Sequence, residues 1–96
     1  MYNYRIGEVK NIGAEVDQLN DPSKFPQVAS VLVRLYNSNG VKLWERAGVA
    51  DSNTVKYKLT DITAKGQYTI QWVVTIGAET LFSDPIKLNV KAANDA

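Results

Sequence analysis

The stretch from Asn53 to Val90 constrains the fold most, because it contains two long runs in which apolar and polar residues alternate. The first run extends from Thr54 to Leu59 and the second from Gln67 to Ile76. The apolar members of the two runs are Val55, Tyr57, Leu59, Tyr68, Ile70, Trp72, Val74 and Ile76. Alternation places residues of one kind on one face of a strand. The sequence therefore predicts two strands, each buried on one face.

The residues between these two strands have the spacing of a tyrosine corner. Leu59, Ile62, Gly66 and Tyr68 follow the pattern Leu-x-x-Ile-x-x-x-Gly-x-Tyr. In such a corner a tyrosine hydroxyl bonds to backbone a few residues upstream, and the motif is typical of immunoglobulin-like sandwiches. We expect the hydroxyl of Tyr68 to bond near Leu59 to Asp61. The sequence predicts an all-β fold, an immunoglobulin-like antiparallel β-sandwich of about seven strands, in one domain of residues 1–96.

A hairpin is predicted earlier in the chain, where two strand-like runs flank Asn39-Gly40. Asn-Gly is a strong hairpin signal because both residues tolerate positive φ. With Asn39 and Gly40 as the two turn residues, three cross-strand pairs are expected: Leu35 with Trp44, Arg34 with Glu45, and Tyr36 with Leu43. This register places Val31, Val33, Leu35 and Trp44 on one face and leaves Leu32, Tyr36 and Leu43 on the outer face.

The remaining segments give weaker signals. Gly7 interrupts a strand pattern and indicates a bulge or a crossing between sheets. Residues 11–27 are interpreted as a short strand followed by a long loop, in which Phe25 either closes the end of the sandwich or is exposed for contact. Residues 76–80 predict a tight hairpin loop. Pro85 interrupts the last strand and favours an edge or a bulge, because proline cannot donate to a ladder.

Several kinds of chemistry are excluded by residue type. The chain has no cysteine and no histidine, so disulfides, thiolate metal sites and the common nucleophile and base pairs cannot form. Asp51, Asp61 and Asp84 lie in predicted turns, where aspartate bonds to local backbone. No ordered carboxylate cluster suits calcium, and the glycines are scattered singly. We predict no enzymatic activity, no catalytic residues, no metal and no cofactor.

The charge and the apolar runs of the chain limit the kinds of partner we expect. Eleven basic and ten acidic residues give a net charge of +1, and no basic run occurs, so we expect no nucleic-acid partner. No apolar stretch approaches membrane-spanning length, so we expect no membrane partner. The first residues lack the basic and then apolar run of a secretory signal. We expect a complete gene product made in the cytoplasm, although an excised domain carrying an added Met would look the same.

The large apolar residues divide into a predicted core and candidate contacts. Trp44, Tyr68 and Trp72 fall on inward faces and are expected to be buried. Aromatic residues on sheet faces and loops are enriched at protein contacts, but single exposed apolar residues are also common. The candidate interface residues are Leu32, Tyr36, Leu43, Phe25 and Phe82.

From Ala29 onward the order of elements resembles a known family. The matching segments are residues 31–36, Asn39-Gly40, Ala50-Asp51, and residues 55–59, 66–72 and 86–90. Together they resemble the small immunoglobulin-like modules of tailed-phage virion proteins, of the kind at the N terminus of the upper baseplate protein. The resemblance implies a structural part of the virion (decoration, neck or baseplate), with other virion proteins or itself as partner. Alternatives are a carbohydrate-binding module and a small phage-encoded inhibitor of a host enzyme, the latter cytoplasmic.

Overall fold

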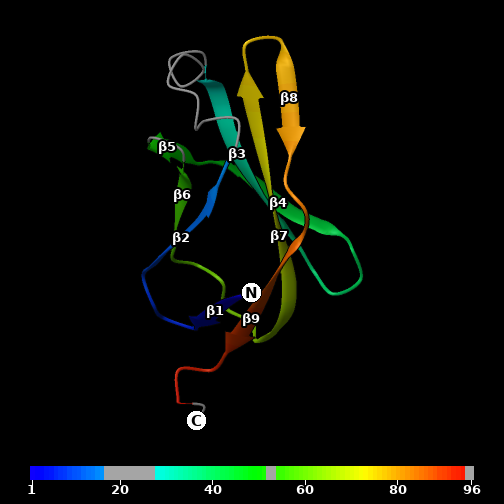
Figure 1. Cartoon of the computed structure of the whole chain (residues 1–96). Coiled ribbons are helices and arrows are strands. Elements are labelled where there is room, and N and C mark those ends of the chain that lie inside the picture. Colours follow the sequence, from blue (N-terminus) through cyan, green and yellow to red (C-terminus); the bar gives the residue numbers. More distant parts are fainter. Residues whose placement is uncertain (17–27, 52–53, 95–96) are drawn as a thin grey trace.

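The computed structural model is an all-β protein with two sheets packed as a sandwich (Figure 1). It describes residues 1–16, 28–51 and 54–94, and no helix occurs in these ranges. The described strands are β1 (Tyr2–Arg5), β2 (Lys10–Glu15), β3 (Val28–Tyr36), β4 (Lys42–Ala47), β5 (Val49–Asp51), β6 (Thr54–Leu59), β7 (Gly66–Ile76), β8 (Glu79–Phe82) and β9 (Ile86–Lys91). The all-β prediction is confirmed. The number exceeds the expected seven because β5 is an additional strand and the last predicted strand is split into β8 and β9.

The two sheets differ in size. One has six strands in the order β1-β9-β7-β3-β4, with β8 also paired to β7; the other has the order β2-β6-β5. Pairing is antiparallel throughout both sheets except between β1 and β9, where Tyr2 lies beside Leu88 in a parallel ladder. β7 is therefore the central strand of the larger sheet, with β3 on one side and β8 and β9 on the other.

The chain crosses between sheets at two glycines. Gly7 follows β1 at φ +94° and leads to β2 in the other sheet, so the predicted crossing is confirmed. Gly48 joins β4 of the larger sheet to β5 of the smaller, and its N–H donates to the Val31 carbonyl at 2.9 Å. A Cβ on Gly48 would lie 3.0 Å from the Lys56 carbonyl oxygen. Only a residue without a side chain allows backbone and core to approach this closely.

Trp72 lies at the centre of the core and is 1% exposed. Its Nε1 donates to the Tyr2 hydroxyl at 3.3 Å, and that hydroxyl donates to the Gly13 carbonyl at 2.6 Å, which links β7, β1 and β2. Around it packs Ile62 from the loop between β6 and β7, with alternating residues of both sheets: Tyr4, Ile12, Val31, Val33, Leu35, Val55, Leu59, Ile70, Val74, Ile76, Leu88 and Val90. Burial of desolvated apolar surface stabilises this arrangement.

Trp44 and Tyr68 are only half-buried, so the prediction of full burial is wrong for both. Trp44 lies on β4, which is an edge strand of the larger sheet and is covered from one side by the ring of Tyr57. Tyr68 lies near the beginning of β7, and its hydroxyl reaches the loop surface. Both side chains pack against the core with one part of the ring.

The tyrosine corner is present, but its acceptor differs from the expected one. The Tyr68 hydroxyl donates to the Ala64 carbonyl at 2.7 Å, not to backbone near Leu59 to Asp61. Leu59 and Ile62 are buried at 0% and 6% exposure and hold the loop onto the core. The half-exposed tyrosine therefore bonds to the exposed side of the loop, close to its own strand.

The β3–β4 hairpin keeps two of its three expected pairs. Arg34 pairs with Glu45 and Leu35 with Trp44, but Tyr36 pairs with Lys42 because the register shifts after Leu35. The prediction that Tyr36 faces Leu43 is wrong. The cause is the turn, in which the Gly40 N–H donates to the Asn37 carbonyl at 3.0 Å and Gly40 has φ +80°. This is a longer loop with a left-handed glycine, and it brings a bulge with it.

Pro85 lies between β8 and β9, where the ladder along β7 is interrupted. The side chain of Ser83 compensates: its Oγ accepts from the Trp72 N–H at 2.9 Å, and the Ser83 N–H donates to the Trp72 carbonyl at 2.9 Å. β9 pairs on both sides and is not an edge, whereas β8 pairs only with β7. The predicted hairpin at 76–80 is confirmed, with Ile76 opposite Glu79 and Gly77 at φ +59°.

Candidate interaction surface

The outer face of the six-stranded sheet carries a continuous apolar row. Ala47 lies beside Leu32, Leu32 beside Val73, and Val73 beside Phe82, so the row crosses β4, β3, β7 and β8. These residues alternate with Val33, Trp72 and Leu81, which point into the sandwich. We call the row, together with Tyr36 on the same face and the exposed Leu43 beside the register shift in β4, the outer patch. Leu32, Tyr36 and Phe82, three residues predicted from the sequence as contacts, therefore lie on one face. Phe25 lies outside the described residues.

Exposure varies across the outer patch. Phe82 is 59% and Leu43 48% exposed, whereas Leu32 and Tyr36 are half-buried. Val73 is only 4% exposed although the smaller sheet packs against the opposite face. Its neighbours in the row, and the Arg34 guanidinium 5.7 Å from the Phe82 ring centre, shield it. The outer patch thus combines a packed centre with an exposed aromatic margin.

The charged residues next to the apolar row neutralise each other. Arg34 Nε donates to Glu45 Oε1 at 2.6 Å across β3 and β4. The hydrogen bond from Arg34 lowers the pKa of the Glu45 carboxyl below its usual value, and the same bond raises the pKa of Arg34. Opposite-charge pairs of this kind contribute little to stability, because solvent screens them. Arg34 and Glu45 therefore compensate each other, and Lys42 opposite Tyr36 leaves a positive charge beside them.

A shallow hollow adjoins the outer patch beside the β3–β4 turn. It has a volume of about 290 Å³ and is lined by Tyr36, Gly40, Thr69, Gln71 and Pro85. The Tyr36 hydroxyl lies 3.4 Å from the Gln71 side-chain oxygen, to which it donates. The hollow therefore has a largely apolar lining with polar groups along one wall.

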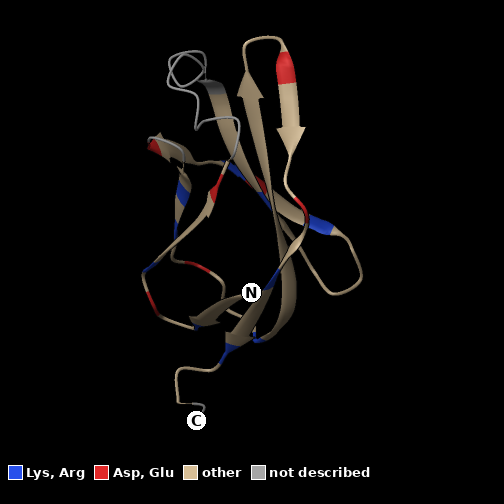
Figure 2. Ribbon diagram, in the orientation of Figure 1, with Lys and Arg blue, Asp and Glu red and all other residues tan. Residues whose placement is uncertain are grey.

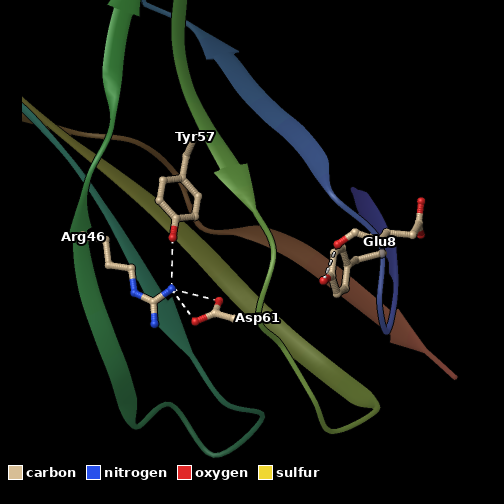
Figure 3. A network of polar contacts seen from close by, with 5 residues as sticks. Glu8, Arg46, Tyr57 and Asp61 are labelled. Atoms are coloured by element: carbon tan, nitrogen blue, oxygen red, sulfur yellow. Dashed lines mark hydrogen bonds and ion pairs between the residues drawn. The ribbon is translucent and has the colours of Figure 1, made fainter. Parts of the chain in front are cut away.

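Sequence reasoning missed a second cluster, built around Arg46 (Figure 3). Its guanidinium lies 4.2 Å from the Trp44 ring centre, and Nη1 donates to the Tyr57 hydroxyl at 3.0 Å and to Asp61 Oδ1 at 2.8 Å. The hydrogen bond to Tyr57 raises the pKa of Arg46. Alternation in the sequence could have indicated this cluster, because Arg46 is two residues from the inward Trp44 and so shares its face. Because Nη1 already bonds to Tyr57 and Asp61, the cluster is best explained as closing the edge of the sandwich.

No catalytic or metal-binding arrangement is found in the described part of the chain. Within it, no three acidic side chains gather where they could hold a metal ion, and no polar or charged side chain is buried. Acidic and basic residues are spread over both sheets (Figure 2). Asp51 bonds to Lys56 and Asp61 to Arg46, so both have structural partners. Among the residues described, no helix is long and apolar enough to cross a membrane.

A cleft of about 350 Å³ opens between the sheets on the side of β2 and β8. Its lining includes the core residues Val55, Trp72 and Val74, with Glu15 and Asp84 at the rim. Ser83 also lines it, but its hydroxyl bonds to backbone, accepting from the Trp72 N–H and donating to the Asp84 carbonyl.

Comparison with known proteins gives no relative: no family model, no curated protein and no solved structure matches the chain.

Proposed function

We propose that this chain is a non-enzymatic binding module whose contact surface is the outer patch. The observation that carries the proposal is the apolar row from Ala47 to Phe82, which crosses four adjacent strands on a face not covered by the second sheet. Isolated exposed apolar residues are normal, but contiguous ones rimmed by polar groups mark interaction sites. Phe82 is the most exposed member of this row.

The chemistry of the outer patch favours a protein partner. Interface centres are depleted in charge and enriched in aromatic residues, while their rims are polar. Arg34 and Glu45 neutralise each other beside the row, and Thr75 and Ser30 pair along its other side. Both tryptophans lie on the inner face, so the aromatic rings of the outer patch are the smaller ones of Tyr36 and Phe82. A partly apolar face with a compensated ion pair beside its centre suits assembly better than sugar binding.

We further propose that the sandwich is of the immunoglobulin-like kind. The order β2-β6-β5 corresponds to strands B, E and D of that fold, and β9-β7-β3-β4 corresponds to G, F, C and C′. The tyrosine corner then stands at the beginning of strand F, where the fold has it. The first strand differs from the constant-type arrangement because it joins the larger sheet beside β9.

The more specific role, a virion component acting through contacts with other virion proteins or with itself, rests on the resemblance to tailed-phage modules. Single modules of this size reach a useful affinity when many copies act together, because linked sites raise the effective concentration. An assembled particle provides that arrangement. A stable contact should bury about 1,000 Å² or more in total.

The test compares two double variants in light scattering during size-exclusion chromatography. Phe82→Ser with Leu43→Ser removes the two large exposed apolar residues of the outer patch; Val9→Ser with Val49→Ser removes two apolar residues elsewhere that are 68% and 65% exposed. We expect the wild type and the control to self-associate or to bind purified particles, and the outer-patch variant to remain free. All three should melt at similar temperatures, because surface substitutions change stability by about 0.5 kcal/mol or less.

Two outcomes contradict the proposal. Equal loss of association in both double variants would show that general surface hydrophobicity drives it. A strict monomer at high concentration that is absent from purified particles would remove the virion role, and binding to a glycan or a host enzyme by that monomer would establish one of the alternative functions instead.

A further inference from the structure

The turn between β3 and β4 contains the only Asn-Gly pair in the sequence, Asn39-Gly40. Both residues are exposed, and a Cβ added to Gly40 would meet no atom within 4 Å. Glycine has no side chain, so the side-chain amide of Asn39 can fold back onto the backbone nitrogen of Gly40. We propose that Asn39 is a site of spontaneous deamidation and that opening of this turn controls the rate.

The reaction needs only water as co-reactant. The backbone nitrogen of Gly40 loses its proton and bonds to Cγ of Asn39; the bond from Cγ to Nδ2 breaks and ammonia leaves. The five-membered succinimide that results is opened by water at either carbonyl. Addition at Cγ gives aspartate, and addition at the backbone carbonyl gives isoaspartate. Neither oxidation nor reduction occurs.

The folded turn restrains the attacking nitrogen. The Gly40 N–H donates to the Asn37 carbonyl at 3.0 Å, and the side-chain oxygen of Asn37 accepts from the N–H groups of Asn39 and Val41 at 2.9 and 3.0 Å. Attack requires the first bond to break. The reaction therefore proceeds from the locally opened turn, and its rate follows the population of that open state.

The neighbouring asparagine is protected by the same geometry. The side-chain oxygen of Asn37 holds two hydrogen bonds, and the next residue, Ser38, carries a Cβ. Asn37 and Asn39 thus have opposite roles: the first closes the turn and the second is modified when the turn opens.

The modification changes both charge and backbone. A new carboxylate takes the formal net charge from +1 to zero. Isoaspartate also routes the chain through Cγ, which adds one backbone atom to a loop whose length sets the register of β3 and β4. Gly40 lines the hollow next to the outer patch, and among the described strands β4 pairs only with β3. The change is therefore local to this hairpin.

The experiment follows the intact folded protein in mildly alkaline buffer, by peptide mapping with mass spectrometry able to distinguish isoaspartate. We expect a gain of about one mass unit per molecule, located at Asn39, with an isoaspartate fraction. Asn39→Ser should show no gain at this position. Asn37→Ala removes two hydrogen bonds that hold the turn and should speed conversion of Asn39 by about fivefold or more.

A short peptide covering residues 36–42 serves as the unfolded reference and should convert faster than the protein. Absence of conversion at Asn39 in the protein while the peptide converts would overturn the proposal. An unchanged rate in Asn37→Ala, in a variant shown to remain folded by circular dichroism, would overturn the control by turn opening.

Discussion

The two faces of the six-stranded sheet use alternate residues of the same strands for different purposes. On the inner face Val33 and Trp72 lie beside each other at 0% and 1% exposure; on the outer face the next pair, Leu32 and Val73, ends at a Phe82 that is 59% exposed. Both faces are apolar at their centres, but only the inner one is covered by a second sheet. The comparison teaches that apolar content alone does not separate core from contact surface. The covering layer does.

The largest expected difference between the faces comes from truncating one aromatic on each. Trp72→Ala should lower the free energy of unfolding by about 3 to 5 kcal/mol, because a large buried ring leaves a cavity. Phe82→Ala should cost less than about 1 kcal/mol, since its ring is exposed and packs mainly below Arg34. Urea unfolding followed by circular dichroism measures both. Similar losses would show that the outer face is also a structural core.

A smaller effect on stability is expected at Gly48, where the core approaches the backbone of Lys56. Gly48→Ala places a Cβ 3.0 Å from the Lys56 carbonyl oxygen and 3.3 Å from Cζ3 of Trp72, which should cost about 1 to 3 kcal/mol through overpacking. Ala47→Ser, which enlarges the exposed neighbouring residue, is the matched control and should be nearly neutral. Differential scanning calorimetry compares the two. A neutral Gly48→Ala would mean that the crossing has room to relax.

Loss of the tyrosine-corner hydrogen bond should lower the free energy of unfolding by about 1 kcal/mol or less. Tyr68→Phe removes the hydroxyl that bonds to the Ala64 carbonyl, and because that carbonyl is exposed, water can replace the donor. Tyr36→Phe on the outer face removes only a hydroxyl 3.4 Å from Gln71 and should change even less. The melting temperatures of the two variants are compared. A larger decrease for Tyr36→Phe than for Tyr68→Phe would contradict the view that the Tyr68 hydroxyl contributes more to stability.

The smallest effect on stability at neutral pH is expected for substitution of the buried Tyr4 on the inner face. Burial, with the charges of Asp61 and Glu8 adding to it, raises the pKa of Tyr4 above its usual 10.0. The pKa of Tyr4 is higher in the folded chain than in the unfolded chain. Its stabilisation of the fold is therefore complete below the pKa of the unfolded chain and is lost as the pH rises through the pKa of the folded chain. We expect the melting temperature to fall above pH 10, and to fall less in Tyr4→Phe. Identical alkaline profiles would exclude Tyr4 as the cause.

The hairpin register shows how far local patterns reach. Pairs Arg34 with Glu45 and Leu35 with Trp44 follow from alternation and opposite charge alone, and both are confirmed. The third pair failed because an Asn-Gly signal does not reveal whether a turn has two residues or more. That choice depends on side-chain bonds from Asn37, three residues before the glycine.

Alternation by itself determined the all-β class, the inward face of β3, β6 and β7 and the burial of Trp72, because residues two apart share a face whatever the neighbours are. The candidate contacts Leu32, Tyr36, Leu43 and Phe82 were also named from the sequence, but as separate residues. Only tertiary structure brought Leu32, Tyr36 and Phe82 onto one surface, since the pairing of β3 with β7 and of β7 with β8 joins segments far apart in the chain. It alone also decided that Trp44 is half-buried and that Arg46 meets Asp61, because both depend on where the smaller sheet ends.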